Sequence, residues 1–271
     1  MTGPAGATLP GVQLPPAFYL PDGDGFLATA LTIGPWDPGL QHAGPPAALL
    51  AREVERTGGI DGGQPVRLAF DVLGPVPVGP VGVTARVLRP GRRIELVEAT
   101  LEAGGRPAMR LTAWRMRTRD AAATASPEQP FAVGPGDSRP GAFGVFAQEV
   151  AYHRSLEWRV ATGSITDSGP AATWTRPLCA LVEGEPITPL QHLLVMTDAA
   201  SGVSAALDWS RATFANVDLV VALFRPPAGQ WLAMDAATTL GPTGVGQCTA
   251  DLYDVGGRIG RSVASLFVEP R

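Results

Sequence analysis

The sequence contains no lysine: all 21 of its basic residues are arginine, in a chain of 271 residues. Schiff-base chemistry, a lysine general base and the phosphate-binding lysine of a P-loop are therefore excluded. The arginines are scattered and the formal net charge is −4, so the sequence has no basic stripe and nucleic acid is not an expected partner. These absences remove several classes of enzyme and of binding protein.

Cysteine and histidine are also scarce, at two and three residues. Cys179 and Cys248 lie far apart with no CxxC motif, and each fits a small buried hydrophobe better than a metal ligand or half of a disulfide. His42, His153 and His192 have no metal-ligand spacing with the cysteines or with one another. We therefore predict no metal site and no cofactor.

The N-terminal segment lacks the pattern of a targeting sequence. Residues 1–20 are rich in proline and glycine and have no basic start followed by an apolar run, so they predict neither a signal peptide nor a membrane span. We expect a cytoplasmic protein without a membrane partner. Its 45% of hydrophobic residues suffice for one large core or for two coupled smaller ones.

The chain carries a weak internal repeat at a shift of about half its length. The string LGPVPVG at residues 73–79 answers LFRPPAG at residues 223–229, and GGR at 104–106 answers GGR at 256–258. Each half follows the same order: one helix, a strand that ends in a Pro/Gly break, and further strands joined by Gly-containing turns. The half-unit is therefore a helix followed by an antiparallel meander.

In the first half, the pattern predicts a helix over about residues 46–57, which the glycine pair 58–59 ends. The narrow apolar face of this helix consists of Ala47, Leu50, Ala51 and Val54. Strands are predicted over residues 27–33, 66–73, 81–88, 94–101 and 108–117.

In the second half, a helix is predicted over residues 188–204, with Thr188 as its N-cap, Pro189 in the first turn and Gln191 completing a capping box. The residues from Val217 to Phe224 are largely apolar at both alternating sets of positions, which predicts a strand covered on both faces. Strands are predicted over residues 156–160, 172–174, 215–224, 231–239, 246–253 and 259–268.

Between the halves, residues 121–141 are mainly Ala, Ser, Pro and Gly with little periodicity, which is typical of a linker. The predicted domains are an N-terminal unit over residues 1–120 and a C-terminal unit over residues 142–271. A helix laid across a curled antiparallel sheet covers the apolar face of that sheet, which predicts the α+β fold class. Two such sheets can join edge to edge and so remove exposed edges.

Asp198 is an acid placed where the second helix should be apolar. Leu190, Leu194 and Asp198 follow at i, i+4 and i+8, so the carboxylate shares a stripe with two leucines. An acid in such a place is costly unless it has a partner. Asp198 is therefore either a satisfied structural hydrogen-bonding group or a site residue, and we favour the site.

Several strings in both halves carry a resemblance. They are GPWD at 34–37, QHAGPPAALL at 41–50, TDAASG at 197–202, NVDL at 216–219 and FRPP at 224–227. In order and spacing they resemble the double-hotdog acyl-CoA thioesterase family, which includes the bacterial type II medium-chain enzymes. The resemblance implies two fused hotdog units, each a helix wrapped by an antiparallel sheet, with a site between them that hydrolyses acyl-CoA or a related acyl thioester.

In that family an acid, a glutamine and a threonine or serine position a water, while a backbone N–H polarises the thioester carbonyl. The resemblance assigns the acid to Asp198 and the hydroxyl position to Asn216, whose amide can also hold a water. The glutamine position falls on Ala264, which cannot orient a water. Either another polar group, such as Ser262, Ser265 or Asn216, takes its place, or the protein is a very slow or non-catalytic binder of acyl thioesters or lipids.

The resemblance also indicates residues for substrate binding, Gly44 and Ser201 among them. His42 either faces the site from the start of the first helix or is a loop histidine bonded to a neighbouring carbonyl. Trp36 lines an acyl tunnel or caps an edge of the core. Arg225 meets the phosphates of coenzyme A or is solvated. The oligomeric state stays open between a monomer and a homo-oligomer.

Other chemistries fit the sequence less well. The string GVSAA at 202–206 lacks the second glycine and the preceding strand of a serine nucleophile elbow. DGDG at 22–25 lacks the glutamate of a calcium loop, since Leu31 stands at its position. Hydration of an enoyl thioester ranks last, because Asp198 and His192 would lie on different faces of one helix.

Overall fold

The structure is a computed structural model that describes residues 8–9, 12–127, 129–209 and 211–270. Part of the N-terminal segment on which the targeting prediction depends, residues 1–7 and 10–11, lies outside the described residues. Within those ranges, no helix has the length and the hydropathy that a membrane crossing requires.

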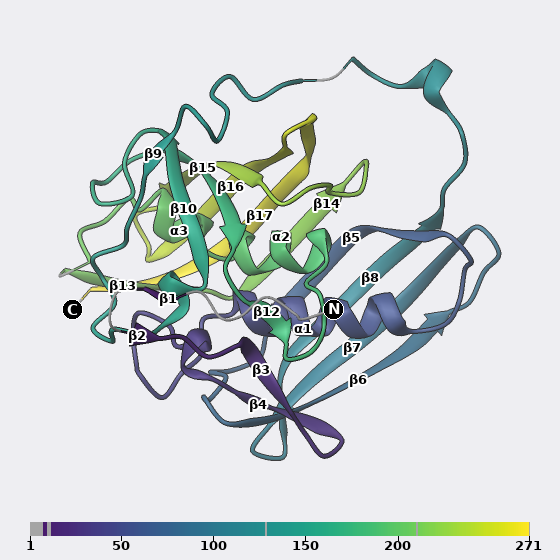
Figure 1. The fold of residues 1–271 in the computed structure, drawn as a ribbon, viewed down its shortest axis with the longest axis horizontal. Coiled ribbons are helices and arrows are strands. Elements are labelled where there is room, and N and C mark those ends of the chain that lie inside the picture. The colour runs from purple at the N-terminus through teal and green to yellow at the C-terminus, as the bar shows by residue number, and fades with distance from the viewer. Residues whose placement is uncertain (1–7, 10–11, 128, 210, 271) are drawn as a thin grey trace.

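The N-terminal half contains one long helix, α1 (Gly44–Arg56), which lies across a curled antiparallel meander (Figure 1). Two prolines in its first turn favour the start of this helix, because proline has the helical φ and needs no N–H partner there. The other elements of this half are β1 (Thr8–Leu9), β2 (Val12–Gln13), β3 (Ala17–Asp22), β4 (Gly25–Ala28), the short 3-10 helix η1 (Ala30–Thr32), β5 (Gly63–Val72), β6 (Pro80–Arg89), β7 (Ile94–Ala103) and β8 (Arg106–Arg117).

The C-terminal half repeats this order with its helix in two pieces, α2 (Pro189–Thr197) and α3 (Ala200–Val203). Its strands include β13 (Ala212–Asn216) and β14 (Asp218–Leu223), which divide the single strand predicted over residues 215–224. The remaining elements are η2 (Ala122–Thr124), β9 (Arg139–Pro140), η3 (Tyr152–Arg154), β10 (Leu156–Thr162), β11 (Ala171–Pro177), β12 (Ala180–Val182), β15 (Leu232–Leu240), β16 (Val245–Asp254) and β17 (Gly257–Pro270).

The two meanders join edge to edge into one continuous sheet. Strand β14 pairs antiparallel with β5, with Val220 opposite Ala69, and β14 also pairs with β17 on its other side. On either side of this junction the strand order is the same by position in the repeat, β5-β8-β7-β6 in one half and β14-β17-β16-β15 in the other. The predicted joining of the two sheets, which covers an edge of each, is confirmed.

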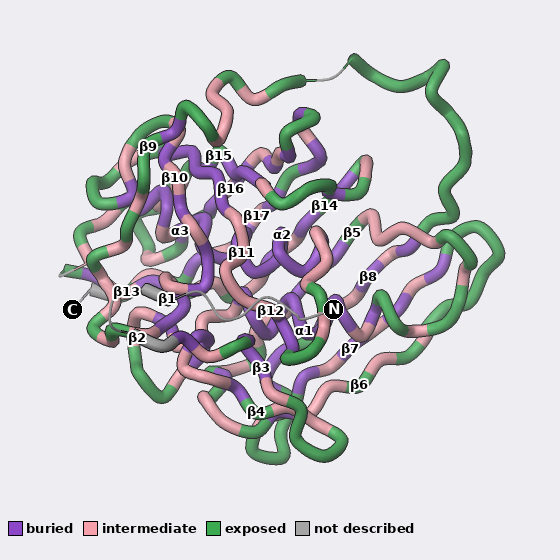
Figure 2. The backbone as a smooth tube through the Cα atoms, viewed as in Figure 1, coloured by how far each residue is buried: buried purple, intermediate pink, exposed green. Residues whose placement is uncertain are grey.

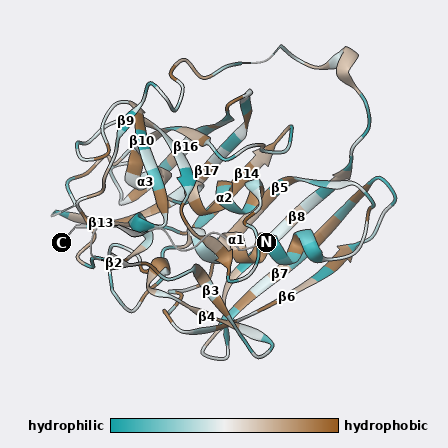
Figure 3. Cartoon of the chain, viewed as in Figure 1, coloured by the Kyte–Doolittle hydropathy of each residue, from teal (hydrophilic) through white to brown (hydrophobic). Residues whose placement is uncertain are grey.

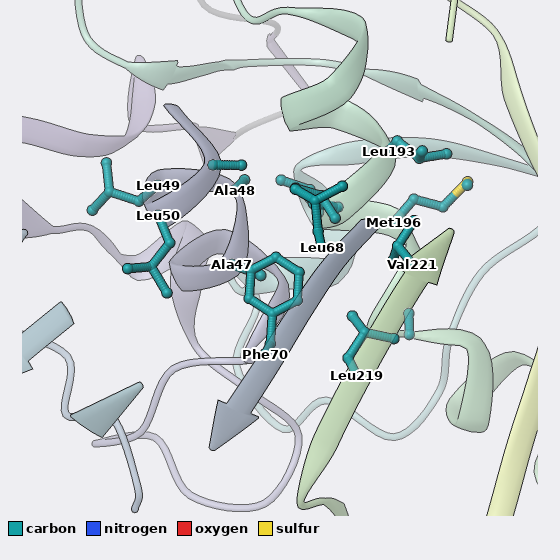
Figure 4. Packing of buried hydrophobic residues seen from close by; sticks show 14 of the residues in the cluster. Ala47, Ala48, Leu49, Leu50, Leu68, Phe70, Leu193, Met196, Leu219 and Val221 are labelled. Atoms are coloured by element: carbon teal, nitrogen blue, oxygen red, sulfur yellow. The ribbon is translucent and has the colours of Figure 1, made fainter. Parts of the chain in front are cut away.

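Helices α1 and α2 pack against each other and against the inner face of this sheet, and this layer is the core (Figure 2). Figure 4 shows Ala47 of α1 beside Phe70 on the central strand β5, and Met196 of α2 beside Val221 on the central strand β14. The four residues of the predicted apolar face of α1 are fully buried. Ala48 and Leu49 are buried as well, so the covered part of this helix is wider than predicted.

Strand β14 is covered on one face only, so the prediction of burial on both faces is wrong. Leu219, Val221 and Leu223 are buried, whereas Ala222 is exposed and Phe224, just past the strand, is 66% exposed. The reason is that both helices lie on the same side of the joined sheet. Figure 3 shows hydrophobic and hydrophilic residues alternating along the long strands β6, β7 and β8, as one covered face requires.

The segment between the halves has two parts. Residues 118–127 are exposed and belong to the long loop between β8 and β9 in Figure 1. Farther along, the Trp174 indole N–H donates to the Val133 carbonyl at 2.7 Å, and Phe131 makes edge contacts with the rings of Trp174 and Tyr253. The part that follows residue 128 is therefore attached to the C-terminal half.

Candidate functional site

A cavity of about 430 Å³ lies where the two halves meet, at the N-terminal end of α1 and the C-terminal end of α2. Both halves contribute to its wall, which is mainly apolar. The ionisable side chains in the wall are Asp37, His42, Tyr152 and Asp198. The aromatic ones, apart from Tyr152, are Trp36, Phe143, Phe146, Trp209, Phe214 and Phe267.

The capping box predicted at the start of α2 is confirmed: the Thr188 hydroxyl accepts from the Gln191 N–H, and the Gln191 side chain accepts from the Thr188 N–H. The predicted helix over residues 188–204 is nevertheless interrupted, because α2 ends with Asp198 as its C-cap. The Ala199 N–H bonds the Met196 carbonyl at 3.0 Å, which tightens the last turn. The acid therefore lies at a helix end and not in the middle of a helix.

Asp198 is buried and hydrogen-bonded on both carboxylate oxygens. Its Oδ2 lies 2.9 Å from His42 Nδ1, and its Oδ1 accepts from Asn216 Nδ2 at 2.6 Å. Burial by itself raises the pKa of this carboxyl, but the charge and hydrogen bond of His42, the Asn216 amide and the Gly44 N–H outweigh burial, so the pKa lies below its ordinary value. Asp198 is therefore a paired carboxylate that stays ionised near neutral pH.

His42 extends this pair toward the cavity. Its Nδ1 faces Asp198, which assigns the proton of a neutral ring to Nδ1 and leaves Nε2 as an acceptor. The imidazole lines the cavity, and no hydrogen bond from the described part of the chain reaches Nε2. Of the two readings of His42 from the sequence, the structure favours the one that faces the site.

Asn216 holds Asp198 in place. Its Nδ2 donates to the backbone carbonyl of Asp198 at 3.0 Å as well as to Oδ1, so both amide hydrogens are used. Its Oδ1 accepts from Ser201 Oγ at 3.3 Å. The pairing with β17 shifts by one residue between Asn216 and Val220, so the strand is irregular beside the site. Asn216 can thus reach a water only through the remaining lone pair of Oδ1.

The start of α1 supplies backbone donors. Pro45 and Pro46 have no N–H, and the N-cap residue, Ala43, makes no side-chain cap. The Gly44 N–H points at the Asp198–His42 pair, and its nitrogen lies 3.2 Å from His42 Nδ1. Ala43 lines the cavity, and within the described residues its N–H has no hydrogen-bond partner, which leaves it available at the positive end of the helix.

Three aromatic side chains from both halves form one wall of the cavity. The ring centroids of Trp36 and Trp209 lie 4.9 Å apart, and Phe214 lies 5.3 Å from Trp36 and 4.8 Å from Trp209. Trp36 therefore lines the cavity, as one of its two predicted readings had it. A Cβ atom on Gly202 would lie 3.5 Å from the Trp209 ring, so α3 supports this wall closely.

Two residues that the sequence connected with the site lie elsewhere. Arg225 follows the end of β14 that is remote from Asn216, and its guanidinium bonds both carboxylate oxygens of buried Asp254, one of them at 2.7 Å. Arg225 is not among the residues that line this cavity, so its contact with a substrate phosphate stays a prediction. Ala264 on β17 is 5% exposed and is not among the residues of the cavity wall.

Tyr152, Trp209 and Phe214 were missed by the sequence analysis. Each is an isolated aromatic residue in a turn, a short 3-10 helix or a short strand, where no periodicity marks a common face. His192 lies in the core, where its Nε2 is 2.9 Å from the Thr175 hydroxyl and burial lowers its pKa to about 3. Among the described residues, no group of three metal-ligating side chains could hold a metal ion.

Sequence comparison matches both halves of the chain to known domains. Residues 32–116 match the acyl-CoA thioesterase N-terminal domain, and residues 120–268 match the acyl-CoA thioesterase C-terminal domain. No curated protein matches the chain.

Comparison with solved structures shows that the chain has the hotdog fold. A conserved hot dog fold protein of unknown function from Alicyclobacillus acidocaldarius superposes with a TM-score of 0.72 at 16% identity, over 93% of this chain and 95% of that one. The acyl-CoA thioesterase II TesB2 from Mycobacterium marinum gives 0.66 at 15% identity, over 92% and 94%. The tesB protein of Mycobacterium avium subsp. paratuberculosis gives 0.66 at 16% identity, over 91% and 93%. With the two observed helix-and-sheet halves, this makes the fold a double hotdog of the α+β class.

Proposed function

We propose, since the chain belongs to the acyl-CoA thioesterase family by a matched domain in each half, that it hydrolyses acyl-CoA or a related acyl thioester in the cavity between its two units. For the division of the chain we propose units over residues 1–120 and 142–271, with residues 121–141 as the connection. The single observation that carries the proposal is the buried Asp198–His42 pair at the wall of a mainly apolar cavity.

The geometry supports His42 as the base and Asp198 as the group that orients it. Both oxygens of Asp198 already accept hydrogen bonds, whereas Nε2 of His42 has none from the described residues. A water bound at Nε2 loses a proton to the imidazole as its oxygen attacks the thioester carbonyl carbon. The ionised Asp198 then stabilises the imidazolium, in the way that a carboxylate supports a histidine base elsewhere.

The rest of the reaction uses the start of α1. The Ala43 N–H, at the positive end of the helix, is the donor that we propose for the oxyanion of the tetrahedral intermediate. When that intermediate collapses, the C–S bond breaks and the imidazolium returns its proton to the leaving thiolate. The products are a carboxylic acid, which then releases its proton to solvent, and a free thiol, and no covalent enzyme intermediate is needed.

The wall of the cavity supports an apolar acyl group as the part of the substrate that it holds. Trp36, Trp209 and Phe214 offer a continuous aromatic surface, and none of the described residues that line the cavity is an arginine. The charged end of a coenzyme A thioester would therefore lie outside the cavity, with the thioester at the Asp198–His42 pair and the acyl chain inside.

The test is release of free thiol from a panel of acyl-CoAs by the parent protein, Asp198→Asn and His42→Gln. Both substitutions remove the pair, so each should lower kcat by about 10²–10⁴-fold in a folded protein. Asp198→Asn with parental turnover would exclude the acid. Loss in Asp198→Asn alone, with His42→Gln unchanged, would mean that Asp198 itself takes the proton from the water.

A second candidate is an acyl-thioester or lipid binder with little or no hydrolysis. It is favoured by one observation: the position at which the family has its glutamine holds Ala264, and that residue lies outside the cavity wall. Tight binding of an acyl-CoA with no release of thiol, from the parent protein as well as from Asp198→Asn, would establish this second function.

A further inference from the structure

Tyr152 stacks against the His42 imidazole. The backbone N–H groups of the two residues bond neighbouring carbonyls of one short stretch of the chain. The His42 N–H bonds the Thr32 carbonyl at 2.7 Å, and the Tyr152 N–H bonds the next carbonyl, that of Ile33, at 3.1 Å. Tyr152 belongs to η3 of the C-terminal half, so this stretch fixes a residue of one unit beside a residue of the other. Neither the sequence nor the resemblance indicated Tyr152.

The Tyr152 ring restricts the orientation of the imidazole. The two ring planes differ by 1°, and their centroids are 3.7 Å apart, which is full parallel stacking. A ring stacked in this way can rotate only within its own plane, and the bond from Nδ1 to Asp198 fixes that remaining rotation. With the tyrosine removed, the imidazole could tilt and Nε2 would lose its direction into the cavity.

The Tyr152 hydroxyl acts on the other member of the pair. It donates to the Val195 carbonyl at 2.7 Å. In a continuous helix that carbonyl would accept from the Ala199 N–H, but the Ala199 N–H bonds Met196 instead. The Tyr152 hydroxyl therefore takes the place of the Ala199 N–H as the donor to the Val195 carbonyl, in the turn where α2 ends at Asp198.

We propose that Tyr152 is a positioning residue for the Asp198–His42 pair: its ring fixes the plane of the His42 imidazole, and its hydroxyl fixes the end of α2 that carries Asp198. This inference rests on the proposed hydrolysis for its kinetic effect, although the arrangement itself does not. Tyr152 is 1% exposed, and burial, followed by the negative charge of Asp198, raises the pKa of its hydroxyl. The hydroxyl thus stays a protonated donor at every pH at which the protein would work.

The two roles can be separated by two variants. Tyr152→Phe keeps the stacked ring and loses the hydroxyl, whereas Tyr152→Leu loses both. We expect kcat for thiol release to fall about 10-fold in Tyr152→Phe and about 10²-fold in Tyr152→Leu, since a displaced catalytic group costs about that much. KM should change less than kcat, because the ring and the hydroxyl act through His42 and Asp198. Tyr253→Phe, a tyrosine remote from the cavity, is the matched control and should keep parental kinetics.

A spectroscopic measurement tests the arrangement without turnover. The NMR signals of the His42 ring, assigned by comparison with His42→Gln, report the stacking and the bond to Asp198. They should move strongly in Tyr152→Leu, move less in Tyr152→Phe and stay in place in Tyr253→Phe. If the parent protein hydrolyses no thioester, the proposed function fails, but these signals still decide whether Tyr152 positions His42.

Two outcomes would overturn the inference. One is a folded Tyr152→Leu protein with parental kcat and unmoved His42 signals. The other is a loss that disappears when activity is corrected for the folded fraction, with the His42 signals unchanged, because Tyr152 would then contribute only to stability. Recovery of most of the lost kcat on going from leucine to phenylalanine would support the role of the ring.

Discussion

The backbone carbonyl oxygen of Val195 on α2 occupies the space that a Cβ atom on Gly44 of α1 would need. Only glycine lets the two helices approach this closely here, and this contact lies beside the Asp198–His42 pair. The packing of the two units and the geometry of the site therefore depend on the same contact.

Gly44→Ala should push the start of α1 away from α2. Because the new methyl group meets a backbone carbonyl and not a flexible side chain, relief requires movement of a helix, at a cost of about 1–3 kcal/mol in the free energy of unfolding. Separation of His42 from Asp198 should lower kcat by about 10²-fold. Gly82→Ala is the control, since a Cβ atom there meets no atom within 4 Å. Equal activity in the two variants would contradict the argument; denaturant unfolding and thiol release are the measurements.

Asn216→Ala should weaken the hold on Asp198 without removing the acid. It leaves two buried acceptors, the Asp198 carbonyl and Oδ1, without a donor, which costs about 1–3 kcal/mol. We expect kcat to fall by about 10–10²-fold and Tm to fall. Ser201→Ala removes only the hydrogen bond that the serine hydroxyl donates to Asn216 Oδ1, so its effect should be smaller than that of Asn216→Ala. A larger loss in Ser201→Ala would mean that the serine, and not the asparagine, is the group that matters.

The start of α2 could be predicted from the sequence because its determinants are local. Thr188, Pro189 and Gln191 stand within one turn, and the structure has the predicted capping box. The end of the helix could not be predicted in this way. Its last turn is set by the Tyr152 hydroxyl and by the Asn216 amide, which come from distant parts of the chain and bond backbone carbonyls. No local pattern of residues contains that information.

In the candidate site, too, local features could be predicted from the sequence, whereas contacts between distant parts of the chain could not. The position of Asp198 among leucines marked it from the sequence as a residue that needs a partner, and the partner in the structure is His42 from the other half. Spacing alone left His42 open between two readings, because its role depends on how the two helices cross. Arg225 shows the converse: its flanking residues matched a family string, but a buried carboxylate, Asp254, takes its guanidinium.

Acid should destabilise the protein through His192 at a pH well above that at which Asp198 is protonated. The pKa of buried His192 is lowered from 6.5 to about 3, so between these values the unfolded chain binds a proton that the folded protein does not. Stability therefore falls as the pH drops below 6.5, by about 1.4 kcal/mol for each pH unit. Asp198, whose pKa is lowered, contributes stability above its ordinary pKa and loses it only as the pH falls through the folded value.

His192→Gln is the variant that isolates this contribution. Glutamine can keep a hydrogen bond to Thr175 but does not titrate, so the free energy of unfolding should depend less steeply on pH between about 6.5 and 4.5, by about 3 kcal/mol over the range. The variant should be less stable than the parent near neutral pH, because the imidazole fills its place in the core better. Urea unfolding at a series of pH values gives both quantities, and parallel curves for the two proteins would contradict the assignment.

Ala264→Gln introduces the residue type that the family resemblance implies for this position, and we expect it to lower stability without raising turnover. Ala264 is 5% exposed and lies directly opposite Cys248 in the β16–β17 ladder, and the Cys248 thiol is 3.7 Å from the Ser204 hydroxyl of the helix layer. A longer side chain there overpacks a filled layer, at about 1–3 kcal/mol, and buries an amide that needs partners. Ala222→Gln, on the exposed side of β14, is the matched control and should unfold like the parent. If Ala264→Gln instead raised kcat about tenfold or more at unchanged stability, a missing glutamine would be what limits hydrolysis, and the parent protein would be better described as an acyl-thioester binder with residual activity.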